Sequence, residues 1–414
     1  MSIRHLWLLV HRYVGLAMAS FLVLVGLTGS LLAFSIEINH LVSPRFYAKP
    51  QPGAARLGFA TFIDRAEALV PQEQVYWIQI PSDPNQIDVR FSLRRNTATG
   101  KPYPLAVEDL YLNPWTGQEL GRRKPGEPYP TAFMDKVRKL HEELFLGNFG
   151  FRFMGVIALI WTIDCFIGFY LTLPAALQRF WPRWQQAWLV KWRASAARVN
   201  FDLHRASGLW LWPMLFVFAW SSVMFNLPEV YNGVSRAVFH YQWPPADAEM
   251  PMQGTGNERP PRLDLQAALS TAQRLMAEQA AIHHFSVMEP EVFAYQFDSR
   301  TYFYNVHSSR DIWHSQDSWT TIDFDGDTGA LRKLFIPTGE HAGRTVALWL
   351  VYLHECWFGL PYRIFVCVLG LVIAMLSYTG VYIWWKKRRG RVLAAQKQKA
   401  SFSTSVVQPN EASR

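Results

Sequence analysis

Four long apolar stretches alternate with polar segments along this chain. The apolar stretches run from Tyr13 to Ile36, from Phe153 to Leu173, from Leu209 to Phe225 and from Ile364 to Trp385. A helix needs ~20 apolar residues to cross a hydrocarbon core about 30 Å thick, so the pattern predicts four transmembrane helices. The third stretch is the shortest, and Pro213 and Pro228 mark its limits.

Two polar segments, near 40–139 and 228–345, separate the first stretch from the second and the third from the fourth. Alternating or aromatic-rich runs typical of β-strands occur in both: QVYWIQIP and QIDVRFSL, then VFAYQFDS and TYFYNVHS. Each segment also has a Thr-Gly turn between β-forming residues, within 111–121 and 322–332, which predicts a tight hairpin. A helical pattern at 263–276 precedes the second set of strands. We therefore predict two small α+β domains, each with a helix packed on an antiparallel sheet.

The second turn is rich in aspartate, but it does not fit a calcium-binding EF-hand loop. For a loop that begins at Asp323, the last position is Leu334, where a bidentate glutamate is needed.

Basic residues predict the orientation of the four helices. They gather near the N-terminus, in the loop after the second stretch and after the fourth stretch: Arg4, Arg12, Arg179, Arg183, Lys191, Arg193, Arg198, Lys386, Lys387, Arg388, Arg389 and Arg391. Cytoplasmic flanks of membrane helices carry an excess of Lys and Arg, so both termini are predicted to be cytoplasmic and both polar segments to lie on the opposite side, which the resemblance described below identifies as the periplasm of a bacterial inner membrane. The first apolar stretch is too long for a cleaved signal peptide, which favours an uncleaved transmembrane anchor.

The predicted organisation has eight consecutive parts. They are the N-terminus with the first transmembrane helix (1–38), a first periplasmic domain (40–139), the second transmembrane helix (140–173), a cytoplasmic loop (174–203), the third transmembrane helix (204–227), a second periplasmic domain (228–345), the fourth transmembrane helix (346–387) and a disordered basic and polar tail (388–414). In the loop, Trp181, Trp184, Trp188 and Trp192 share one helical face. This spacing predicts a helix in the membrane interface; a docking surface for an electron donor is the alternative.

Composition argues against several classes of function. Much of the net charge of +9 lies in the cytoplasmic flanks, where basic residues meet anionic lipid, so it does not indicate nucleic-acid binding. The three cysteines lie in or beside the apolar stretches and form no CxxC, which argues against an iron–sulfur centre and covalently attached haem. No GxGxxG string is present, so neither NAD(P)H nor FAD is expected to bind.

Four histidines stand in two matched contexts at the edges of the apolar stretches. His11 begins HRYVGL and His204 begins HRASGL, while His141 lies in LHEELFLG and His354 in LHECWFGL. The matched contexts indicate a tandem duplication. With the predicted orientation, His11 and His204 lie at the cytoplasmic end of the spans, and His141 and His354 at the periplasmic end. Two histidines from different helices fill both axial positions of a haem iron, so the pattern predicts two b-type haems and favours electron transfer.

Residues near these histidines provide further candidates for haem contacts. Gly15 and Gly208 each follow a histidine by about one helical turn and leave room for a flat macrocycle. Four neighbouring arginines are candidate partners of the haem propionates, although topology and lipid headgroups explain each one equally well: Arg12, Arg205, Arg152 and Arg363. Binding of another metal is the main alternative for the histidines. A zinc protease is disfavoured because neither LHE string continues as HExxH.

Asp164 lies near the middle of the second apolar stretch, where a carboxylate costs about 2.5–3.5 kcal/mol on insertion scales. The duplication does not require it, because the aligned residue of the fourth stretch is Leu376. A role between the haems or in proton uptake and a protonated carboxyl bonded to a neighbouring helix are both compatible with this position. The polar segments contain further histidines without metal-site spacing: His240, His283, His284, His307, His314 and His341.

The two HRxxGL contexts, the two LHE contexts, the Thr-Gly hairpins and the string TGVYIWWKKRR at 379–389 together resemble the PepSY-associated transmembrane proteins. The resemblance extends over roughly residues 4 to 390. It implies an inner-membrane siderophore reductase of bacterial iron uptake, with two periplasmic PepSY-like domains and two haems. The implied partners are a ferric siderophore in the periplasm and a cytoplasmic flavin reductase or quinol as electron donor. Alternatives are a PepSY-domain regulator or peptidase inhibitor without redox activity, and a transporter of an iron chelate.

Overall fold

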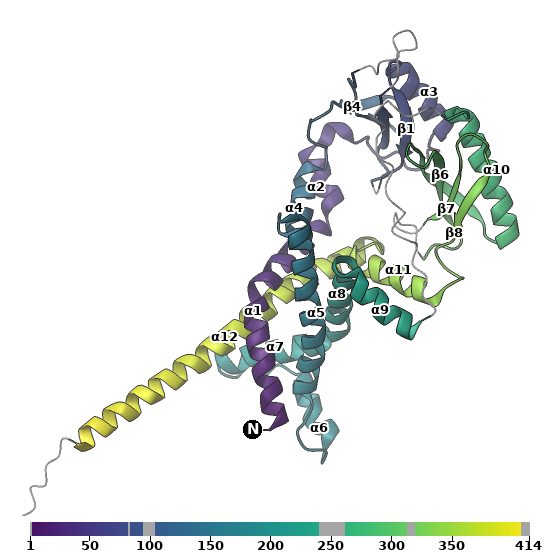
Figure 1. Cartoon of the computed structure of the whole chain (residues 1–414). Coiled ribbons are helices and arrows are strands. Elements are labelled where there is room, and N and C mark those ends of the chain that lie inside the picture. Colours follow the sequence, from purple (N-terminus) through teal and green to yellow (C-terminus); the bar gives the residue numbers. More distant parts are fainter. Residues whose placement is uncertain (1, 82, 94–103, 240–260, 313–318, 407–414) are drawn as a thin grey trace, which may run out of the picture. The chain divides into compact units, whose positions relative to one another are not determined.

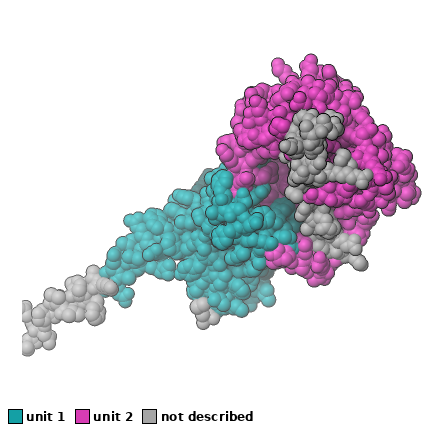
Figure 2. Space-filling view, turned by 45° about the horizontal axis from the view of Figure 1, so that its top comes forward, with its two compact units in different colours: residues 1–33, 140–228, 364–414 teal, residues 34–139, 229–363 magenta. Residues whose placement is uncertain are grey.

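The computed structural model describes residues 2–81, 83–93, 104–239, 261–312 and 319–406. Figure 2 colours the two compact units into which the chain divides. The first, which we call the helical unit, contains residues 1–33, 140–228 and 364–414. The second, which we call the sheet unit, contains residues 34–139 and 229–363. Each unit is described below by itself.

The helical unit is built from the apolar stretches of the sequence (Figure 1). Its main helices are α1 (Ile3–Leu32), α5 (Gly147–Thr172), α7 (Ala196–Trp210), α8 (Trp212–Asn226) and most of α12 (Gly359–Val406). Of the described helices, α1, α5 and α12 are each long and apolar enough to cross a membrane. The third predicted span corresponds to α7 and α8, which are bent by 67° relative to each other and become a fourth candidate span if they count as one.

The bend between α7 and α8 follows from Pro213, which lies in the first turn of α8. Proline has no N–H for the carbonyl one turn earlier, and its ring clashes with that carbonyl, so α7 cannot continue through this position. Leu211 ends α7 by donating its N–H to the carbonyl of Ser207. The single straight span predicted from Leu209 to Phe225 is therefore a shorter helix that begins at Trp212.

Small residues let the helices of this unit approach closely. A Cβ atom on Gly26 of α1 would lie only 2.5 Å from the carbonyl oxygen of Gly370 on α12. Ser30 strengthens the same crossing, because its hydroxyl donates to the carbonyl of Cys367 at 2.8 Å. Gly155 of α5 similarly lies against Leu227 at the end of α8. Close backbone approach at small residues is the usual basis of helix packing in membranes.

The sheet unit repeats one arrangement twice, a helix followed by a four-stranded antiparallel meander and a second helix. The first copy is α3 (Phe59–Leu69), β1 (Gln74–Gln79), β2 (Ile87–Ser92), β3 (Asp109–Leu112), β4 (Glu119–Arg123) and α4 (Ala132–Glu143). The second copy is α10 (Leu265–His283), β5 (Val287–Gln296), β6 (Thr301–Ser308), β7 (Thr320–Asp325), β8 (Leu331–Phe335) and α11 (Ala342–His354). Shorter connecting helices are α2 (Ser35–Val42), η1 (Pro44–Phe46) and α9 (Pro228–Val238).

The two predicted α+β domains share one sheet instead of folding separately. Its strand order is β4-β3-β2-β1-β5-β6-β7-β8, so the two meanders join where β1 pairs with β5. In this antiparallel junction Ile78 lies opposite Phe293, and neither residue is exposed. Helices α3 and α10 contribute to the same continuous core as the strands, including the fully buried Phe62 and Ile63 of α3.

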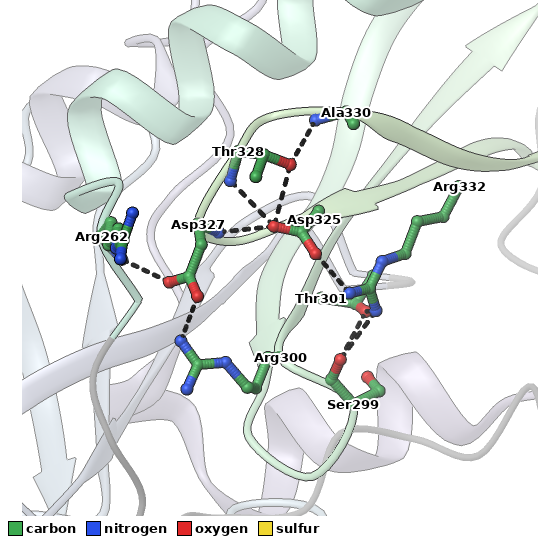
Figure 3. A network of polar contacts seen from close by, with 9 residues as sticks. All are labelled: Arg262, Ser299, Arg300, Thr301, Asp325, Asp327, Thr328, Ala330 and Arg332. Atoms are coloured by element: carbon green, nitrogen blue, oxygen red, sulfur yellow. Dashed lines mark hydrogen bonds and ion pairs between the residues drawn. The ribbon is translucent and has the colours of Figure 1, made fainter.

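Both predicted Thr-Gly hairpins are present and have the same hydrogen bonds. In the β3–β4 turn, Asn113 Oδ1 accepts the backbone N–H groups of Trp115 and Thr116. In the β7–β8 turn, Asp325 Oδ1 accepts those of Asp327 and Thr328 (Figure 3). The final glycine of each turn has a φ of about +70°, a conformation that favours glycine: Gly117 at +67° and Gly329 at +71°.

The carboxylates of the second turn are occupied by protein partners, as Figure 3 shows. Asp325 pairs with Arg332, and Asp327 pairs with Arg300 at 2.5 Å and accepts the N–H of Arg262 at 3.0 Å. The N–H groups of Thr328 and Asp327, together with Arg332, hold the pKa of Asp325 well below its usual range. This arrangement agrees with the prediction of a structural turn in place of a calcium loop.

Two segments beside the membrane helices differ from the predictions. Helix α12 continues to Val406, so residues 388–406 are helical where we predicted a disordered tail. Residues 388–400 are mostly Lys, Arg, Gln and Ala, which are good helix formers, so the helix continues beyond the apolar stretch.

The tryptophan-rich loop is not one continuous helix. Trp181 and Trp184 lie on α6 (Phe180–Gln185), Trp188 ends the 3-10 helix η2 (Gln186–Trp188), and Trp192 lies beyond both. Side chains from α7 bind the carbonyls at this point and end the helix. Arg205 donates to the carbonyl of Gln186 at 2.6 Å, and Trp210 donates to that of Trp188 at 3.0 Å.

Candidate functional site

The structure brings His11 on α1 and His204 on α7 together inside the helical unit. Their ring centroids are 6.3 Å apart, and their ring planes are inclined at 63°. The two residues come from the matched HRxxGL contexts, so the duplication is visible as a pair of facing helix positions. This pair is the centre of the candidate site.

Hydrogen bonds fix the protonation of both rings in the same way. His11 Nδ1 lies 2.9 Å from Asp164 Oδ1, and the carboxylate can only accept. His204 Nδ1 lies 3.0 Å from the hydroxyl of Thr379 and 3.1 Å from the carbonyl of Leu376. The Thr379 hydroxyl donates to that same carbonyl, so it accepts from the ring. Both Nδ1 atoms therefore carry hydrogen, and both Nε2 atoms keep the lone pair that binds metals.

His141 has the same protonation, although it lies elsewhere in the helical unit. Its Nδ1 is 2.9 Å from the hydroxyl of Thr28 on α1. That hydroxyl donates its hydrogen to the carbonyl of Leu24 at 2.8 Å, so it accepts from His141. His141 therefore also carries its hydrogen on Nδ1, and its metal-binding lone pair is on Nε2.

The two LHE contexts end helices; they do not begin the spans, as the sequence had suggested. His141 lies in the last turn of α4, and the chain turns at Leu144 and Phe145, which have positive φ values, before α5 begins. His354 is the last residue of α11 in the sheet unit, and Cys356 has a positive φ before α12 begins. In each repeat a short turn directly after the LHE context separates the helix that ends there from the helix that follows.

A glycine on a neighbouring helix lies against each of the three candidate ligands in the helical unit, His11, His204 and His141. A Cβ atom on the glycine would lie 3.2 to 3.4 Å from Cε1 of the imidazole: Gly168 against His11, Gly380 against His204 and Gly29 against His141. Our sequence analysis did not identify these glycines. A usable signal was present, because Gly168 follows Asp164 by the same four residues that separate Gly380 from Leu376.

The two glycines that the sequence did identify are in open surroundings. A Cβ atom on Gly15 would meet nothing within 4 Å, and one on Gly208 would meet only Leu376 at 3.9 Å. Space is therefore available one helical turn from His11 and from His204. This space and the paired nitrogen donors fit a planar group held by both histidines.

Two of the four candidate arginines are engaged by acidic side chains. Arg205 binds Asp202, which is completely buried and also pairs with Arg198. Arg363 binds both carboxylate oxygens of Glu37, within the sheet unit. These ion pairs explain Arg205 and Arg363 without a haem propionate. Of the other two, Arg12 follows His11 directly on α1, and Arg152 lies in the first turns of α5, whereas His141 lies on α4.

The histidines of the sheet unit have different surroundings. His307 lies between two buried carboxylates, with Nδ1 2.8 Å from Asp311 and Nε2 bonded to Glu291. Burial lowers the pKa of His307, but hydrogen bonds to Asp311 and Glu291 outweigh it and raise the pKa to about 9. His283 and His284 end α10, His341 precedes α11, and His240 and His314 lie outside the described residues.

His307 predicts a pH-dependent stability of the sheet unit. Its folded-state pKa of about 9 exceeds the ordinary value of 6.5, so its contribution is complete below pH 6.5 and is lost as pH rises through 9. We expect the thermal midpoint of the wild type to fall across this interval. In His307→Gln the fall should be smaller, as measured by circular dichroism of the detergent-solubilised protein. Parallel pH curves for the two proteins would contradict this role.

Comparison with known protein families matches residues 8–387 to the PepSY-associated TM region. Comparison with curated proteins gives no match. The family match includes all four histidines of the duplicated contexts and every strand of the sheet. Because the match extends over most of the chain, the protein belongs to the PepSY-associated TM region family.

Proposed function

We propose that this protein carries electrons across the bacterial inner membrane through two b-type haems and reduces a ferric siderophore in the periplasm. The observation that carries this proposal is the pair of His11 and His204, with a centroid separation of 6.3 Å. A metal–imidazole bond is about 2 Å long, so an ion between two rings separates their centroids by roughly 6 Å. The shared Nδ1–H protonation supports the same assignment, because it leaves a lone pair on both Nε2 atoms.

The number of protein ligands favours haem over a simple metal ion. A structural zinc site takes four side chains. Within the described parts of the chain, no group of three or more His, Cys, Asp or Glu residues is suited to a metal ion. A porphyrin supplies four nitrogens of its own, so two histidines suffice. When bound with both axial positions filled, such a group supplies one-electron transfer without an open site for oxygen.

The second haem is proposed at the other end of the spans, with His141 and His354 as ligands. His141 supports it through the same Nδ1 protonation as the first pair, and His354 through its equivalent sequence context. The distribution of Lys and Arg supports a cytoplasmic position for His11 and His204 and a periplasmic position for the sheet unit. Electrons from a cytoplasmic flavin reductase or from quinol would then reach the periplasmic side one at a time. One electron converts chelated iron(III) to iron(II), which weakens the siderophore complex.

A dithionite-reduced visible spectrum with haem quantitation tests this proposal. We expect close to two haems per chain, a low-spin b-type spectrum and reoxidation of the reduced protein by a ferric siderophore. Purified protein with no haem absorption would overturn the proposal and leave a transporter of an iron chelate or a PepSY-domain regulator. Haem that a ferric chelate does not reoxidise would retain electron transfer but exclude this substrate class.

A further inference from the structure

The three candidate ligands in the helical unit, His11, His204 and His141, differ in the charge of the group that accepts the Nδ1–H. For His204 the acceptors are the neutral carbonyl of Leu376 and the neutral hydroxyl of Thr379. For His141 the acceptor is the neutral hydroxyl of Thr28. For His11 the acceptor is a carboxylate, that of Asp164.

The duplication makes this difference informative. Asp164 and Leu376 occupy equivalent positions, each four residues before the glycine that lies against the histidine. At one position the ring is held by a backbone carbonyl, and at the other by a side-chain carboxylate. Orienting the ring therefore does not require a charge. Asp164 is nevertheless buried in an apolar helix, where a carboxylate is costly. We therefore expect its charge to have an effect besides orienting the ring of His11.

We propose that Asp164 is a positioning residue whose negative charge lowers the reduction potential of the haem held by His11 and His204. This inference rests on the proposed function. A carboxylate that accepts the Nδ1–H of a ligand makes the imidazole a stronger electron donor. A stronger donor stabilises iron(III) over iron(II), and second-shell hydrogen bonding is one of the means by which proteins set haem potentials. The buried location of Asp164 keeps this interaction from being weakened by water.

A lower potential makes this haem a stronger reductant, so electron transfer from it to the next acceptor becomes more favourable. The contact with His11 on α1 agrees with the interpretation of Asp164 as a carboxyl bonded to a neighbouring helix, and the proposal assigns to its charge an effect on the haem.

The test is a potentiometric titration of the full-length protein, followed by haem absorbance. Asn at position 164 keeps an oxygen that accepts the Nδ1–H but removes the charge. We expect Asp164→Asn to raise one of the two potentials, that of the haem which His11→Ala removes, by at least 59 mV, a tenfold change in the one-electron equilibrium between the haems, and to leave the other in place. Thr379→Val is the matched control at the same site, since it removes a neutral acceptor and should shift the potential much less.

A second variant decides the outcome if Asp164→Asn loses haem. Leu376→Asp places a carboxylate at the equivalent position beside His204 and should lower the potential of the same haem further. Unchanged potentials in Asp164→Asn, an equal shift of both haems, or no decrease in Leu376→Asp would overturn the proposal. These failures are distinct from failure of the proposed function, which would show as a wild-type protein without haem.

Discussion

Replacing His11 or His204 with alanine should remove one of the two haems from the purified protein and leave the other bound. Under the proposed function each variant would delete one of the two ligands of the same haem, and the ring centroids of these ligands lie 6.3 Å apart. A b-type haem has no covalent attachment, so loss of one of its two ligands should weaken its binding strongly. The measurement is the ratio of haem to protein, which should fall from two to one in both variants.

Three further variants make this result specific. Alanine at His141 or His354 should remove the other haem. Each of these variants should therefore retain the haem that His11→Ala loses, as seen in its reduced absorption spectrum. His5→Ala is the matched control, because His5 lies on the same helix as His11 and should leave both haems in place. If His11→Ala and His204→Ala removed different haems, or if either removed both, the pairing would be incorrect.

The fold was predictable from sequence where a pattern is local. The apolar stretches predicted the membrane helices, and the Thr-Gly motifs predicted both hairpins because Asn113 and Asp325 bond to N–H groups only two and three residues ahead. The pairing of β1 with β5 could not be predicted in this way. It joins residues from different halves of the chain, and a strand pattern does not specify which other strand lies at its edge.

In the candidate site, too, only the features that follow from a local sequence pattern were predictable. Duplicated contexts singled out His11 and His204, whereas the partners that orient their rings come from α5 and α12. Asp164 was noticed because a charge in an apolar stretch is costly, but its distance in sequence concealed that it bonds to His11. Leu376 acts through its backbone carbonyl, which every residue has, so no side-chain pattern could have revealed it.

The glycines beside the histidines lead to the second large prediction. A Cβ atom on Gly380 would lie 3.3 Å from Cε1 of His204, and one on Gly168 would lie 3.4 Å from Cε1 of His11. Such contacts are already tight, so a leucine side chain at either position must push the imidazole away from its Nδ1 partner. Gly168→Leu and Gly380→Leu should therefore each lose the haem that His11→Ala loses, although every proposed ligand is still present.

The same reasoning separates this effect from general misfolding. Gly29→Leu should instead affect the haem of His141, since Gly29 lies against that ring. Retention of the second haem in each variant shows that the helices still pack. Gly390→Leu is the control on α12, because a Cβ atom there meets nothing within 4 Å and both haems should be kept. If Gly380→Leu kept both haems with unchanged potentials, the ring of His204 would not need its present position, and its assignment as an iron ligand would fail.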